Sequence, residues 1–160
     1  MTEALPDVLR CVIVALPAAW LTLGVLDNIL YPSINRDAVT DVLGMTALAD
    51  YPKVEARVGH RRLTSSRLVV WLFRLIVAGE LAATLLLWLA VLALAGAGFG
   101  WVGDGIAHTL ALIGLLAFTG VWAAFLIGGQ WFYYWYGDHG QHTHMLAALW
   151  GLASMAALSI

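Results

Sequence analysis

The chain has 160 residues, of which 62% are hydrophobic and only 11% are charged, and its formal net charge is -2. A soluble domain has about a quarter charged residues. This chain therefore lacks the charge that a water-facing surface needs, and its mean hydropathy of +0.86 indicates lipid as the surrounding medium. The weakly acidic balance excludes the basic field of a nucleic-acid-binding protein. The composition predicts an integral membrane protein in contact with membrane lipids.

Four apolar stretches predict transmembrane helices, at about 8–30, 67–94, 105–132 and 143–160. About 20 apolar residues cross the hydrocarbon core, and the last stretch barely reaches that length. The amino end reads MTEALPD, which is acidic where a signal peptide is basic, so we expect the first stretch to be retained as a span. The sequence therefore predicts a single all-α membrane domain over 1–160, folded as an up-and-down four-helix bundle.

A polar segment at about 33–66 separates the first two predicted spans. The residues that recur at helical spacing are Val39, Val42, Leu43 and Thr46. This pattern predicts a short amphipathic helix on the membrane surface or across the end of the bundle, with Asn35 or Asp37 as its N-cap.

Basic residues are concentrated in this first loop, and the other two loops have none. The positive-inside rule then places the first loop on the cytoplasmic side of the membrane, with both termini outward. Six of the eight Lys and Arg residues lie in or at the edges of the loop: Arg36, Lys53, Arg57, Arg61, Arg62 and Arg67.

A dense aromatic run follows the third predicted span. We interpret it as a belt at the level of the lipid headgroups. A stacking wall for a quinone or for a partner subunit is the alternative. The run consists of Trp131, Phe132, Tyr133, Tyr134, Trp135 and Tyr136.

Two ionisable residues, Arg74 and Glu80, interrupt the second predicted span. Charged groups at membrane depth normally face the bundle interior and have a partner. Six positions on a helix separate two side chains by about 120°, so we expect Arg74 to pair with Asp27 instead, with help from Asn28 and Gln130. Such a buried polar cluster either locks the helix register or forms a relay or binding site for a proton or small ion.

Three histidines, His139, His142 and His144, occur within six residues around the start of the last predicted span. Their spacing is compatible with zinc or copper ligands, and the alternative is a solvated polar loop. We predict no cofactor, and a bound lipid or quinone remains an alternative. No nucleophile, base and oxyanion donor can be placed together, so an enzyme is the least favoured class.

Several short motifs resemble an uncharacterised bacterial family of predicted small integral membrane proteins, domain of unknown function twenty-one sixty-five. The matching runs are NRDAVTDVLGMTA at 35–47, GGQWF at 128–132 and DHGQ at 138–141, together with Glu80. Family members carry His, Asp and Glu where this chain has Asp41, Thr46 and Gln130. The resemblance implies four spans and no particular activity, and the three departures favour a structural role for the motif in this chain.

Taken together, these features favour a small non-catalytic accessory or structural subunit of a larger membrane complex, respiratory or otherwise energy-transducing. A span-only protein offers lateral surface and short loops to other integral membrane subunits. Two alternatives are a small homo-oligomeric channel or transporter that uses Arg74 and Glu80, and a metal- or quinone-binding redox helper.

Overall fold

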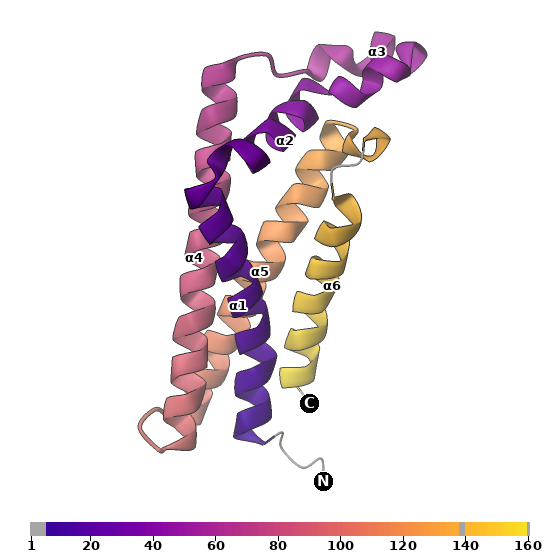
Figure 1. The fold of residues 1–160 in the computed structure, drawn as a ribbon. Helices are drawn as coiled ribbons and strands as arrows, with labels where there is room; N and C mark the ends of the chain where they lie inside the picture. Colours follow the sequence, from indigo (N-terminus) through magenta and orange to yellow (C-terminus); the bar gives the residue numbers. More distant parts are fainter. Residues whose placement is uncertain (1–5, 138–139, 160) are drawn as a thin grey trace.

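The computed structural model describes residues 6–137 and 140–159, and these residues form helices and turns without a strand. The long helices are α1 (Asp7–Leu30), α4 (Ser66–Gly98), α5 (Asp104–Trp131) and α6 (Gln141–Leu158). α5 packs along both α4 and α6, and α1 packs mainly along α4 (Figure 1). The predicted all-α fold is confirmed.

Three of these helices, α1, α4 and α5, are long and apolar enough to cross a membrane. Their bounds lie close to the predicted spans at 8–30, 67–94 and 105–132. α6 is not among these candidate spans within the described residues. Its first turn contains Gln141, His142 and His144, so its apolar part begins only at Met145.

The first loop is more helical than predicted. It contains α2 (Pro32–Gly44), η1 (Thr46–Asp50), α3 (Pro52–Val58) and η2 (Gly59–Arg61). The predicted N-caps Asn35 and Asp37 are wrong, because α2 begins at Pro32. Proline suits the first helical position, since its φ is already helical and its missing N–H would have no partner there.

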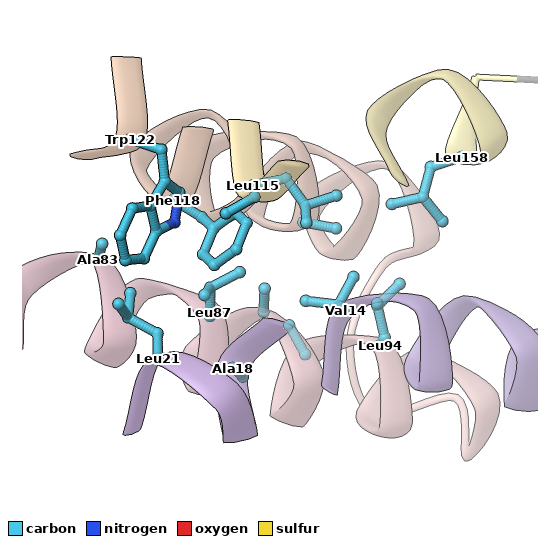
Figure 2. Packing of buried hydrophobic residues seen from close by; sticks show 14 of the residues in the cluster. Val14, Ala18, Leu21, Ala83, Leu87, Leu94, Leu115, Phe118, Trp122 and Leu158 are labelled. Carbon is cyan, nitrogen blue, oxygen red and sulfur yellow. The ribbon is translucent and has the colours of Figure 1, made fainter. Parts of the chain in front are cut away.

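Close contacts between the helices depend on glycines. A Cβ atom on Gly114 would lie 3.2 Å from backbone atoms of Leu86 and Leu87, so α5 and α4 approach backbone to backbone at this point. A Cβ atom on Gly151 would lie 2.1 Å from Thr119 Oγ1, so side chains of α5 pack directly on the backbone of α6 at this point. Large apolar side chains fill the centre around these contacts (Figure 2): Val14, Leu21, Leu87, Leu115 and Phe118.

The two ends of the bundle differ in charge. At one end, Arg10 on α1 forms ion pairs with Asp7, at 3.4 Å, and with Asp104 at the start of α5, at 2.7 Å. The last turn of α6 lies at this same end (Figure 1). The first loop, with its six basic residues, lies at the opposite end beside η3 (Tyr134–Tyr136).

Candidate functional site

A buried polar pair joins α1 to α4. The side-chain amide of Asn28 donates a hydrogen bond of 2.6 Å to Glu80 Oε2, and the two residues are only 6% and 5% exposed. Asn35 on α2 in turn donates a hydrogen bond of 2.7 Å to Asn28 Oδ1. A hydrogen-bonded chain therefore runs from a carboxyl group inside the bundle to an exposed amide in the first loop.

The structure does not bring the rest of the predicted polar cluster together. Asp27, Arg74 and Gln130 are exposed, and the Arg74 guanidinium lies 5.4 Å from the ring of Trp71 on its own helix. No ion pair between Arg74 and Asp27 occurs among the residues that the structure describes. Arg74 and Asp27 do not pair because they lie at different heights along the bundle and because the Asp27 side chain points away from α4.

The hydrogen bond to Asn28 places the end of α1 level with Glu80. Arg74 is about 9 Å further along α4, at 1.5 Å per residue. Asp27 precedes Asn28, so its side chain points about 100° away from the face that Asn28 turns to α4. The predicted cluster of Arg74 with Asp27 and Asn28 is therefore wrong, and Asn35 bonds to Asn28 instead of capping a helix.

The aromatic run packs partly against the first loop. The guanidinium of Arg61 lies 4.3 Å from the ring centroid of Trp131 and 5.6 Å from that of Tyr133. Tyr136 contacts Tyr51 at a centroid distance of 4.6 Å. These contacts hold the loop between α5 and α6 to the loop between α1 and α4.

Within the run, Trp131 and Trp135 are exposed and Phe132 is half-buried, whereas Tyr134 is only 6% exposed. Its ring lies on Gly129, where a Cβ atom would come within 2.6 Å of it. The belt interpretation is therefore wrong for Tyr134, which the left-handed backbone of Tyr133 (φ 57°) turns inward. Burial raises the pKa of the Tyr134 phenol above its ordinary value.

The histidines diverge. His142 is exposed, while the His144 ring packs against the rings of Phe125, at 4.8 Å, and Trp122, at 5.6 Å. Positions two apart on a helix point about 200° apart, so α6 cannot direct both imidazoles to one ion. His139 lies outside the described residues. The described part of the chain contains no group of three His, Cys, Asp or Glu residues able to hold a metal.

Three apolar helices of membrane-spanning length, with a polar pair held between two of them, define a small helical integral membrane protein. The family model described as Predicted small integral membrane protein (DUF2165) matches residues 7–160, and the chain belongs to this family. The family resemblance found in the sequence is thereby confirmed. No curated protein and no solved structure matches the chain.

Proposed function

We propose that this protein is a non-catalytic accessory subunit of a larger complex in the bacterial inner membrane. Asp27 carries the proposal. It is an exposed carboxylate on α1, and it forms no ion pair within the described part of the chain. The free-energy cost of exposing this carboxylate depends on how deep Asp27 lies in the bilayer.

Exposed aromatic side chains supply a depth scale. Trp71 is 66% exposed near the start of α4, and Phe99 and Trp101 are 71% and 81% exposed in the turn after it. Aromatic residues concentrate at the two interfaces of a membrane. From Trp71 to Gly98, α4 rises about 40 Å at 1.5 Å per residue, which agrees with a bilayer thickness of about 40–45 Å including headgroups.

On this scale, Arg74 lies about 16 Å from the midplane, at the edge of a hydrocarbon core about 30 Å thick. There its guanidinium can reach the headgroups. Glu80 lies about 7 Å from the midplane on the same scale, and Asn28 supplies its hydrogen bond from inside the bundle. Asp27, beside Asn28, has the depth of Glu80 but faces outward.

A carboxylate that faces hydrocarbon is costly, because no donor or cation in the lipid tails replaces its hydration. A basic or hydrogen-bonding side chain from a neighbouring subunit would remove this cost. The apolar residues around Asp27 are exposed too and would extend the contact: Leu23 is 64%, Leu26 45% and Leu30 63% exposed. α1 thus offers a lateral surface with one polar centre.

The interior of the bundle is filled with apolar side chains, which favours contact with other subunits through the outer surface over a channel through the bundle. Leu21, Leu87, Leu115 and Phe118 are at most 1% exposed in the middle of the bundle. A homo-oligomeric channel that uses both Arg74 and Glu80 would need them on one path. Glu80 instead faces Asn28 inside the bundle, and Arg74 lies on the outer surface.

The proposal includes α6 as a fourth span and the first loop on the cytoplasmic side. α6 packs along α5 and ends at the same end of the bundle as Arg10 (Figure 1). Arg10 is paired with two carboxylates at that end, whereas six basic residues lie at the other end. The positive-inside rule favours the end with more Lys and Arg as cytoplasmic.

The test is co-purification of the tagged full-length protein from its native membrane in a mild detergent. We expect larger membrane subunits at a fixed stoichiometry, with a marked loss of these subunits in the Asp27→Leu variant. Asp37→Leu removes an exposed carboxylate from α2 and serves as the matched control that retains the complex. A photo-crosslinking residue in place of Leu23, which is exposed one turn before Asp27 on α1, should join the protein to the same subunits. Purification of the wild type as a lone monomer, without crosslinks from position 23, would refute the proposal.

A further inference from the structure

Four residues with a buried, unpartnered polar atom lie where α5, η3 and α6 meet. Trp122 Nε1, Tyr134 Oη, Gln141 Oε1 and His144 Nδ1 have no hydrogen-bond partner among the residues that the structure describes. His144 lies at the centre of the group. Its ring centroid is 5.6 Å from that of Trp122 and 6.1 Å from that of Tyr134. Gln141 lies one helical turn before it on α6, with its amide nitrogen already bonded to the carbonyl oxygen of Gly137, at 3.1 Å.

Such a group of atoms requires an explanation. At least about 90% of buried polar groups in proteins have a partner, either in the protein or in ordered water. Trp122 and Tyr134 are more than nine-tenths buried, with exposures of 8% and 6%. Bulk solvent and lipid headgroups therefore do not reach them freely. Their buried polar atoms therefore call for a small molecule inside the bundle that forms hydrogen bonds.

We propose that this group is a binding site for internal water at the first-loop end of the bundle. The chemistry of the four atoms indicates a neutral ligand. The indole N–H of Trp122 only donates, the amide oxygen of Gln141 only accepts, and the phenol and imidazole do either. An anion would be repelled by the amide oxygen, and a cation by the indole N–H. Water donates two hydrogen bonds and accepts two, so it can serve both kinds of group.

Close stacking of the rings restricts the ligand to a small molecule. The His144 ring is stacked on Phe125 at a centroid distance of 4.8 Å, with 21° between the ring planes. A planar ligand such as a quinone ring, inserted between two rings, would need about 7 Å, or two carbon–carbon contacts of about 3.5 Å. The stack is thus already closed to an inserted ring.

Room for a water molecule exists beside Tyr134. A cavity of about 10 Å³ lies between η3 and the first loop, and of the four residues only Tyr134 lines it, together with Phe132, Asp41 and Leu48 among others. A cavity of about 10–15 Å³ is sufficient for one water molecule. The inferred site is independent of the subunit proposal, because it lies inside the bundle and Asp27 takes no part in it.

The direct test is water-edited NMR of the full-length protein, with ¹⁵N-labelled tryptophan, in lipid nanodiscs. We expect magnetisation transfer from water to the indole N–H of Trp122. Trp88 is the matched control, because its indole N–H donates to Thr22 Oγ1 at 2.9 Å within the protein. Transfer to Trp88 should be absent. A spectrum without transfer to Trp122 overturns the proposal.

The sign of a stability change provides a second test. If water is bonded to the Tyr134 hydroxyl, Tyr134→Phe removes a satisfied group, and the melting temperature should fall relative to the control Tyr136→Phe. If the hydroxyl has no partner, its removal relieves a desolvation cost, and the melting temperature should rise. The proposal requires a fall, and an unchanged or raised melting temperature overturns it.

Discussion

Asn28 on α1 donates a 2.6 Å hydrogen bond to Glu80 on α4, across 52 residues of sequence. Both side chains are buried, so this bond adds a polar contact of fixed height to the apolar packing of α1 against α4. Asn28→Ala would leave the Glu80 carboxyl group buried without that donor. We expect a loss of about 1–3 kcal/mol of unfolding free energy, the usual cost of an unsatisfied buried group. Steric trapping in bicelles or denaturation in mixed micelles would measure the loss.

Asn35→Ala is the control for this bond, because it removes the outer, exposed member of the chain. Its loss should be smaller, because the buried hydrogen bond from Asn28 to Glu80 remains in this variant. Equal stability of Asn28→Ala and the wild type would mean that the bond does not fix the helix register.

Contact between α5 and α6 should depend on Gly151 far more than on Gly120. A Cβ atom at position 151 would overlap Thr119 Oγ1 at 2.1 Å and touch Phe118 at 3.0 Å, whereas one at position 120 meets nothing within 4 Å. Overpacking of this kind costs about 1–3 kcal/mol. Gly151→Ala should therefore lower the melting temperature. Gly120→Ala should leave it unchanged or raise it, because alanine favours the helix by about 1 kcal/mol. A neutral Gly151→Ala variant would contradict the close approach of α6 to α5.

The first loop should depend on Arg61 for its attachment to the aromatic run. The guanidinium lies 4.3 Å from the Trp131 ring, and a partly desolvated contact of this type contributes about 0.5–2 kcal/mol. We expect Arg61→Ala to accelerate limited proteolysis between η2 and α4 several-fold in nanodiscs. Arg57→Ala removes the same charge from an exposed position of α3 and should not change the rate. A cleavage rate for Arg61→Ala no higher than that for Arg57→Ala would show that the stacking contact does not hold the loop.

The parts of the fold that depend on composition could be predicted from the sequence. The bounds of α1, α4 and α5 follow from long apolar runs that end at Pro, Gly or polar residues. Glu80 was also recognisable as a buried group, because a carboxyl group within an apolar run stands out. Its partner was not recognisable, since the vertical register of α1 against α4 depends on how side chains such as Leu21 and Leu87 interlock.

The same limit applies to the histidines and the aromatic run. A cluster in sequence indicated shared chemistry for His142 and His144, but the helical period separates them on α6. The inward turn of Tyr134 depends on the left-handed backbone of Tyr133 and on the space above Gly129. Neither feature has a reliable sequence signal, because tyrosine seldom adopts a positive φ.

The membrane topology gives the final prediction. Single cysteines would be introduced into a Cys11→Ser background at Lys53 in the first loop, at Trp101 between α4 and α5, and at Ser159 after α6. If the positive-inside rule holds and α6 spans the membrane, a membrane-impermeant thiol reagent outside the inner membrane should label positions 101 and 159. Position 53 should react only after the membrane is opened. Labelling of 53 alone would reverse the orientation. Labelling of 101 without 159 would place the end of α6 on the side of the first loop, and three spans would then replace four.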